Sequence, residues 1–183
     1  MSVSDIIQDM ESRFKKTVEA ARADFATLRT GRANASILDS FKIEYYGQPT
    51  ALNQLAQIAV PEPRLLTITP YDRTILGTIE KAILRSDLGL NPANDGQLIR
   101  LSIPPLTEER RRDLVKQLAH KAEASRVALR NIRRDANDHF KRDEAITDDE
   151  AKRAEKDVQK LLDRYMAEVD VLQKAKEAEL LEV

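Results

Sequence analysis

Helix-breaking residues are confined to one part of this chain. All 5 glycines and all 7 prolines lie between Gly31 and Pro105, and the two flanking segments contain none. Glycine and proline are the residues least compatible with a helix interior. The distribution therefore predicts a two-domain α+β protein. One domain is helical and discontinuous (residues 1–30 and 106–183), and the other is an inserted β/α/β domain (residues 31–105).

Three helices are expected in the flanks, because apolar residues recur there at helical spacing. The first begins at Ser2 or Ser4 and ends near Gly31, a residue suited to a helix C-terminus. The second runs from about Thr107 to Arg142, and the third from Thr147 toward Leu180. The three apolar stripes are Ile7, Met10, Phe14, Val18, Ala21, Phe25 and Leu28; Leu118, Ala122, Leu129, Ile132, Ala136 and Phe140; and Ala151, Ala154, Val158, Leu161, Tyr165, Val169 and Leu172. They predict an elongated antiparallel three-helix bundle.

The insert alternates extended runs with turns. Extended runs are expected at 41–45, 52–60, 65–69 and 99–103, with a short helix from Asp72 to about Ser86. Tyr46-Gly47 and Asn94-Asp95-Gly96 carry the residues that form tight turns. The insert contains 7 basic and 7 acidic residues, so its charge gives no sign of a polyanion-binding surface.

The second helix carries a row of basic side chains beside its apolar stripe. At about 100° per residue, one face collects Arg126, Arg130, Arg133, Arg134, Asn137 and Lys141. Arg112 and Lys116 project onto the same face several turns earlier. A guanidinium group can bind two oxygens of one phosphate and can stack on bases. The row therefore predicts a contact with a polyanion.

A row of charges on a long helix is also typical of a solvated face held by ion pairs between successive turns. Asp135 and Asp138 are the candidate partners in that interpretation. Against it, Arg130, Arg133 and Arg134 lie within two turns with no acidic residue between them. Residues 106–145 hold 11 basic and 8 acidic residues in a chain of net charge −1. This local excess favours polyanion binding through a patch rather than through the whole surface.

The sequence shows no pattern typical of catalysis or metal binding. The chain has no cysteine, and His120 and His139 are too far apart on one helix to share a metal. Tyr45-Tyr46 resembles a base-stacking pair, but adjacent strand residues point to opposite faces. No apolar run is long enough to span a membrane, and no signal-peptide core follows Met1. We expect a soluble cytoplasmic protein that is not an enzyme.

Five stretches of the chain resemble the bacterial ribosome recycling factor family. They occur in that family's order and are 28–33 (LRTGRA), 44–47 (EYYG), 86–92 (SDLGLNP), 104–111 (PPLTEERR) and 130–137 (RNIRRDAN). The resemblance implies an L-shaped monomer that binds the post-termination ribosome. With the GTPase elongation factor G, such a protein splits the ribosome into subunits for reuse and releases mRNA and tRNA. The partner uses the GTP, so the resemblance implies no cofactor for this chain.

The resemblance also implies roles for particular residues. The bundle would lie along large-subunit rRNA, with Arg130 and Arg133 contacting its backbone. The other rRNA-binding candidates are Arg134, Arg126 and Asn137 in the same row, and Arg111, Arg29 and Arg32 near the joint between the domains.

The joint itself is predicted to be a hinge. The chain crosses between the domains twice, near 29–32 and 103–106, and the hinge candidates are Thr30, Gly31, Pro104 and Pro105.

The alternative function is an elongated helical adaptor or chaperone whose arginine row pairs with an acidic protein. Binding to RNA falls steeply with salt, and salt-tolerant binding to a protein favours the adaptor.

Overall fold

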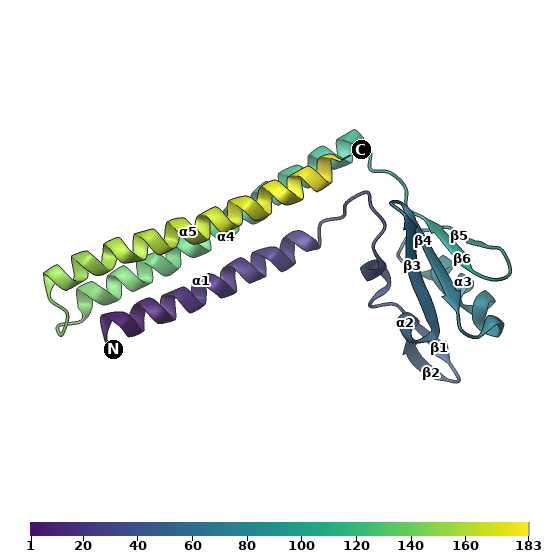
Figure 1. Cartoon of the computed structure of the whole chain (residues 1–183), viewed down its shortest axis with the longest axis horizontal. Coiled ribbons are helices and arrows are strands. Elements are labelled where there is room, and N and C mark those ends of the chain that lie inside the picture. The colour runs from purple at the N-terminus through teal and green to yellow at the C-terminus, as the bar shows by residue number, and fades with distance from the viewer. Residues whose placement is uncertain (183) are drawn as a thin grey trace. The chain divides into compact units, whose positions relative to one another are not determined.

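The computed structural model describes residues 1–182 and divides into two compact units, whose elements are labelled in Figure 1. One unit combines Met1–Thr30 with Thr107–Glu182, and the other is Gly31–Leu106. The first unit is helical, and the second contains the strands of the described chain. The α+β class expected from the distribution of glycine and proline is confirmed.

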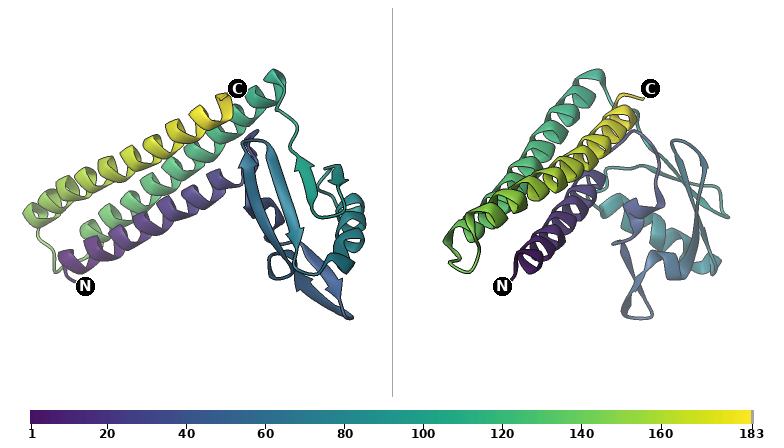
Figure 2. Two further views of the ribbon diagram at one scale, coloured as in Figure 1. Left: turned by 45° about the vertical axis from the view of Figure 1, so that its right-hand side comes forward. Right: turned by 60° about the vertical axis from the view of Figure 1, so that its left-hand side comes forward.

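The helical unit is a bundle of three helices that lie side by side in every view (Figure 2). They are α1 (Val3–Ala26), α4 (Glu108–Arg142) and α5 (Asp148–Leu181). α4 runs antiparallel to α1, because Arg13 pairs with Asp135 while Asp24 pairs with Lys121. A five-residue connection returns the chain from α4 into α5, so α5 is antiparallel to α4 as well.

The predicted apolar stripes form most of the core of the bundle, with two shifts of one residue, and two predicted members of the third stripe, Ala151 and Leu172, are only half-buried. Ile6 rather than Ile7 is buried in α1, and Leu162 rather than Leu161 is buried in α5. Each pair offers two adjacent apolar residues, and helical spacing alone accepts either. Packing selects the one that lies four residues from the next core position, Met10 or Val158.

Side-chain caps begin each helix of the bundle where the sequence predicts. The Ser2 hydroxyl accepts a hydrogen bond from the Asp5 backbone N–H at 3.1 Å. Thr107 accepts likewise from Arg110 at 3.1 Å, and Thr147 from Glu150 at 3.3 Å. These contacts satisfy N–H groups that a first helical turn leaves unpaired. They fix the starts of α4 and α5, and with them which side chains of the two helices face each other.

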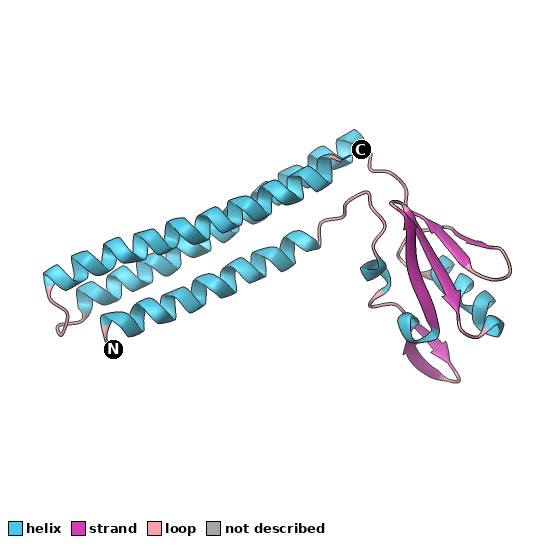
Figure 3. Ribbon diagram, viewed as in Figure 1, coloured by secondary structure: helices cyan, strands magenta, loops and turns pink. Residues whose placement is uncertain are grey.

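The inserted unit is built around a four-stranded antiparallel sheet of order β3-β4-β6-β5 (Figure 3). The strands are β3 (Ala56–Glu62), β4 (Leu65–Pro70), β5 (Pro92–Asn94) and β6 (Ile99–Ser102). A separate hairpin joins β1 (Lys42–Tyr45) to β2 (Gln48–Ala51), and the helical segments are α2 (Leu52–Leu55), α3 (Leu76–Arg85) and the short turns η1 (Ala35–Leu38) and η2 (Arg73–Ile75). Ile79 and Ile83 of α3 pack with Leu66, Ile68 and Leu101 of the sheet into one core.

The hairpin turn places two tyrosines in different environments. Tyr46 and Gly47 have φ values of 50° and 78°, and positive φ at both central residues matches the twist of a two-residue hairpin. Tyr46 is 87% exposed, whereas Tyr45 packs against the core of the insert. Their rings contact each other edge to face, with centroids 4.5 Å apart. The expectation of one inward and one outward tyrosine is confirmed.

Residues 52–60 do not form the single extended run that we predict from the sequence. Leu52–Leu55 make a helical turn, and β3 begins only at Ala56. Leu52 and Leu55 are both buried, and a spacing of three places them on one face of a helix but on opposite faces of a strand. β2 and β5 are absent from the predicted runs because each contains a proline, which only an edge strand accepts readily.

Gly31 does not end the first helix, contrary to expectation. α1 stops at Ala26, and the Thr27 hydroxyl donates a hydrogen bond to the Asp24 carbonyl at 2.6 Å. The backbone of Gly31 is outside the left-handed region that would require glycine. A Cβ added there would lie 3.7 Å from the backbone nitrogen of Leu106, an ordinary contact. Leu28 is buried although it lies beyond the end of the helix, so the row of buried apolar residues continues past the last helical residue.

Candidate nucleic-acid interface on helix α4

The basic row of α4 runs along the border between the buried seam with α5 and the open surface. The expected apolar residues Leu118, Ala122, Leu129, Ile132, Ala136 and Phe140 are all buried. Arg126 and Arg133 donate hydrogen bonds to α5, whereas no hydrogen bond or ion pair joins Arg130 or Arg134 to the described residues of α5. The row therefore combines residues held by a neighbouring helix with residues that project outward.

The side chain of Arg126 is mostly buried and is bonded to α5. Its guanidinium donates to Asp170 at 3.1 Å from Nε and at 2.6 Å from Nη2, and it also donates to Gln173. The side chain is 19% exposed. Both bonds to Asp170 end on the same oxygen, Oδ1, and together with the bond to Gln173 they join α4 to α5 and leave little of the guanidinium for an external ligand.

Arg133 has a neutral partner instead of a carboxylate. Its Nη1 donates to Oε1 of Gln159 on α5 at 3.1 Å. The amide of Gln159 donates in turn to Asp163 at 2.9 Å, which fixes the amide so that its oxygen faces Arg133. Arg133 is thus oriented by α5, and within residues 1–182 it forms no ion pair that would neutralise it. Its charge is free to act on an external anion.

Arg130 is held on its own helix by Glu123, two turns earlier. The two groups approach to 3.0 Å, and the other oxygen of Glu123 lies 3.5 Å from Arg126. The hydrogen bond from Arg130 lowers the pKa of Glu123 below its ordinary value. The carboxylate is therefore ionised at neutral pH and offsets part of the positive charge of the row.

The remaining members of the row differ in how freely they can bind. Arg134 is exposed and has no hydrogen-bond or ion-pair partner among residues 1–182. Lys141 pairs with Glu155 at 3.5 Å, and Arg112 pairs with Glu108 at 2.6 Å. Asn137 is half-buried, and its buried Oδ1 accepts no hydrogen bond from the described residues. Asp135, a candidate partner in the solvated-face interpretation, binds Arg13 of α1 instead of an arginine of the row.

The predicted residues near the joint belong to both units. Arg29 and Arg111 lie in the helical unit, one beyond the end of α1 and the other in the first turns of α4, and Arg32 lies in the insert. Arg29 and Arg32 are exposed, and Arg111 is half-buried. Pro104 and Pro105 are exposed, and Ile103 just before them donates a backbone hydrogen bond to Arg64 at 2.8 Å. The second crossing therefore begins directly after a residue tied to the sheet unit.

Sequence reasoning missed two residues that shape this surface, Glu123 and Gln159. A signal for Glu123 was available, because it lies three and seven residues before two arginines of the row and thus on the same helical face. Gln159 offered none, since it belongs to another helix and reaches Arg133 only after α5 has packed. Both act on guanidinium groups without being basic themselves.

Within residues 1–182, no three acidic, histidine or cysteine side chains are placed so that they could hold a metal ion. A shallow groove of ≈ 430 Å³ is lined by Asp135, Asp138, His139 and Arg142 at the far end of α4. The carboxylate of Asp135 in this groove is already bound to Arg13. In the same range, none of the helices is apolar enough over sufficient length to cross a membrane.

Known proteins resemble this chain over its whole length. A family model described as ribosome recycling factor matches residues 21–181. The ribosome-recycling factor of Syntrophomonas wolfei is 53% identical over 184 residues, covering 99% of this chain and 100% of that protein. The ribosome-recycling factor of Symbiobacterium thermophilum is 54% identical over 182 residues, covering 98% of each.

Two solved structures show the same fold. A solution structure of the ribosome recycling factor is 43% identical, with a TM-score of 0.77 over 100% of this chain and 99% of that one. A second match comes from models for the T. thermophilus ribosome recycling factor and the E. coli elongation factor G bound to the E. coli post-termination complex. It is 45% identical, with a TM-score of 0.62 over 100% of both chains. The chain belongs to the ribosome recycling factor family.

Proposed function

We propose that this protein binds the post-termination ribosome and, together with the GTPase elongation factor G, splits it into subunits for reuse, releasing mRNA and tRNA. Family membership and the full-length match to a recycling factor bound with elongation factor G to a post-termination complex support this function. The observation on this chain that carries the proposal is the row of α4, where Arg133 and Arg134 present guanidinium groups that no carboxylate among residues 1–182 neutralises.

The eight candidate residues have different roles in the proposed rRNA contact. Arg130, Arg133 and Arg134 bind backbone phosphates, because a guanidinium contact to an anion is strong and bidentate geometry is available to it. Arg126 braces α4 against α5, and Asn137 offers an amide beside Arg133 on the same face. Arg29, Arg32 and Arg111 extend the contact toward the joint. Large-subunit rRNA is the partner.

The protein acts without chemistry of its own in this proposal. GTP is bound and hydrolysed by elongation factor G, and the chain works as a cytoplasmic monomer that needs no cofactor. Its contribution is mechanical: the bundle anchors on rRNA while the insert transmits the action of the GTPase. The role of a non-enzymatic translation factor fits the family and the electrostatic character of the arginine row.

Ribosome binding at several salt concentrations tests the anchor. Arg130→Ala with Arg133→Ala should weaken binding by about 100-fold or more, because each of the two charge-assisted contacts contributes roughly 1.5–3 kcal/mol and every 1.4 kcal/mol is about tenfold. The slope of log affinity against log salt should fall by about 0.7–0.9 for each phosphate that the variant no longer neutralises. Arg153→Ala, an exposed arginine on α5, is the matched control and should bind as the parent does.

The same experiment separates rRNA binding from the adaptor alternative. Unchanged affinity for ribosomes after both substitutions would remove the α4 row as the anchor. Salt-insensitive binding of the unsubstituted protein would point to a protein partner rather than to RNA. Circular dichroism of each variant checks that the bundle remains helical.

A further inference from the structure

We propose that Glu123 is a built-in competitor of RNA, which occupies the Arg130 guanidinium in the free protein and must be displaced when a phosphate binds there. The inference rests on the function proposed above and adds a residue that tunes the rRNA contact. It assigns an acidic residue to a nucleic-acid surface, where it acts against binding rather than for it.

The geometry makes Glu123 a bridge between two arginines of the row. One carboxylate oxygen lies 3.0 Å from Arg130 Nη1, and the other lies 3.5 Å from Arg126 Nη1. Arg126 keeps a second carboxylate partner in Asp170, so its place in the bundle does not depend on Glu123. For Arg130, Glu123 is the ion-pair partner found within residues 1–182. Displacement of Glu123 therefore frees Arg130 while the helix packing is preserved.

Both groups are accessible enough for exchange. The Arg130 side chain is 43% exposed, and that of Glu123 is 55% exposed. A phosphate and a carboxylate use the same N–H donors of a guanidinium, so they compete for one site. Exposed ion pairs are weak, so the competition lowers the affinity for RNA modestly and does not prevent binding.

The neighbouring Arg133 shows what the row is like without such a competitor. Its partner is the neutral amide of Gln159, so a phosphate that binds Arg133 breaks no ion pair. Two arginines three residues apart on one face thus differ in the penalty they impose on an incoming anion. After displacement, the charge of Glu123 also remains beside the bound phosphate and repels it.

The competition from Glu123 lowers the affinity for every RNA site by a similar factor. This lowers the occupancy of isolated phosphates more than that of an extended, shape-matched site. RNA that touches only the row binds weakly, and a small penalty lowers its occupancy in proportion. A ribosomal site that makes many further contacts stays saturated despite the same penalty. Glu123 would then reduce adhesion of the protein to bulk RNA in the cell.

The test is a double-mutant cycle of Glu123→Gln and Arg130→Ala, with affinities measured for purified 70S ribosomes and for poly(U). Glutamine keeps the shape of Glu123 and a hydrogen-bond acceptor while removing its charge. Glu123→Gln alone should tighten binding to both partners by about two- to fivefold, the equivalent of a weak exposed ion pair. In the Arg130→Ala background it should give no tightening. Glu144→Gln, an exposed carboxylate in the loop between α4 and α5, is the control for net charge.

Three results would overturn the proposal, and they are distinguishable. If Glu123→Gln weakens or does not change binding while Arg130→Ala weakens it, the rRNA anchor stands and Glu123 is not a competitor. If Glu144→Gln tightens binding as much, or if the Glu123→Gln gain persists without Arg130, the effect is one of net charge alone. If neither Arg130→Ala nor Glu123→Gln changes binding, the proposed anchor on α4 has failed as well.

Discussion

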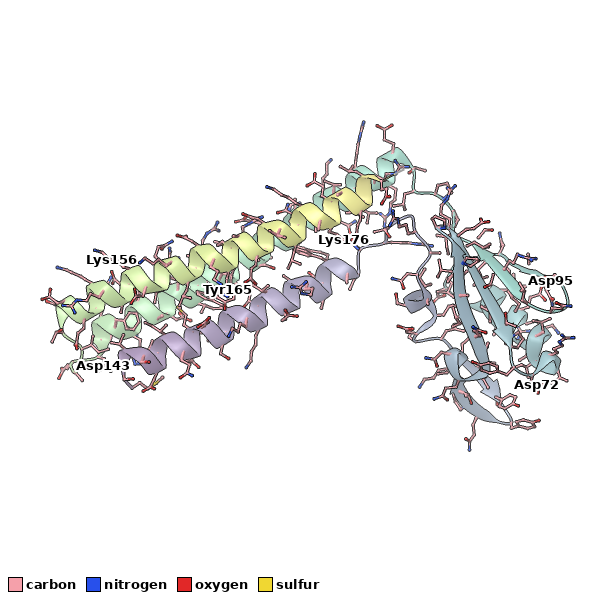
Figure 4. All side chains as sticks on the ribbon, viewed as in Figure 1. Asp72, Asp95, Asp143, Lys156, Tyr165 and Lys176 are labelled. Carbon is pink, nitrogen blue, oxygen red and sulfur yellow. The ribbon has the colours of Figure 1, made fainter. Side chains whose placement is uncertain are left out.

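Tyr165 carries a titratable group into the core of the bundle. The side chain lies among the helices of the bundle (Figure 4). Its ring packs on Phe14 with centroids 5.4 Å apart, and its hydroxyl donates to Glu11 of α1 at 2.9 Å. The side chain is 2% exposed. Burial, and then the hydrogen bond to Glu11, raise the pKa of Tyr165 from 10.0 to about 12. The proton on this hydroxyl is therefore part of what holds α5 to α1.

The raised pKa of Tyr165 predicts a loss of stability in alkali. The folded state holds the phenolic proton more tightly than the unfolded chain, so the contribution is complete below pH 10 and declines as the pH rises toward about 12. Denaturant titrations across this range should show the decline. Tyr165→Phe should cost about 1 kcal/mol at neutral pH and flatten the pH dependence. An equally steep decline in that variant would place the effect on other groups.

Arg126 and Arg133 should separate stability from binding. Arg126→Ala removes the tie to Asp170 and should lower the free energy of unfolding by about 1 kcal/mol, since the contact is well packed but partly solvated. Arg133→Ala leaves the core untouched and should reduce ribosome affinity with little change in stability. Chemical denaturation and ribosome binding, measured on both variants, check the pair. Loss of affinity without loss of stability in Arg126→Ala would make Arg126 a direct RNA contact.

At the scale of elements, the helix starts depend on single side chains. Thr147 begins α5 with a capping box: its hydroxyl accepts from Glu150, and the Glu150 carboxylate accepts from the Thr147 backbone at 2.9 Å. Thr147→Ala should destabilise the bundle by about 1 kcal/mol in thermal or chemical unfolding. Ser12→Ala on the exposed side of α1 is the comparison and should be neutral or slightly stabilising. Equal effects of the two substitutions would mean that the cap contributes nothing.

Features encoded locally were predictable from the sequence, and features that depend on packing were not. Thr107 and Thr147 mark helix starts because a cap needs only the next three residues. The partner of Arg126 is 44 residues away on α5. The spacing of residues along α4 does not reveal which side of α4 packs against α5. The same limit applies to Leu52–Leu55, where burial of both ends turned an apparent strand into a helical turn. The basic row was visible, and so was the position of Glu123 on the same face, but which arginines α5 holds could be known only after the third helix had packed.

At the scale of the whole molecule, the chain passes between the two units at two crossings, which together form the joint. They fall at 30–31 and 106–107, and Gly31 lies against Leu106. We expect a short flexible Gly/Ser segment inserted at both crossings to spare ribosome binding but to abolish splitting by elongation factor G. Each unit has its own core, and only the mechanical link between the units is loosened. Light scattering of ribosomes with GTP measures splitting, and a normal rate in the loosened protein would exclude a mechanism in which force passes between the units through the two crossings.

The discontinuity of the bundle has a consequence for synthesis. α1 leaves the ribosome first, and at about 5–20 residues per second roughly 4–16 s pass before α4 begins to emerge. During that interval six core side chains of α1 have no partner, while the contiguous insert is free to fold by itself. Leu180, at the C-terminal end of α5, is fully buried. The nascent chain therefore cannot complete its arginine-bearing bundle until synthesis has passed the end of α5.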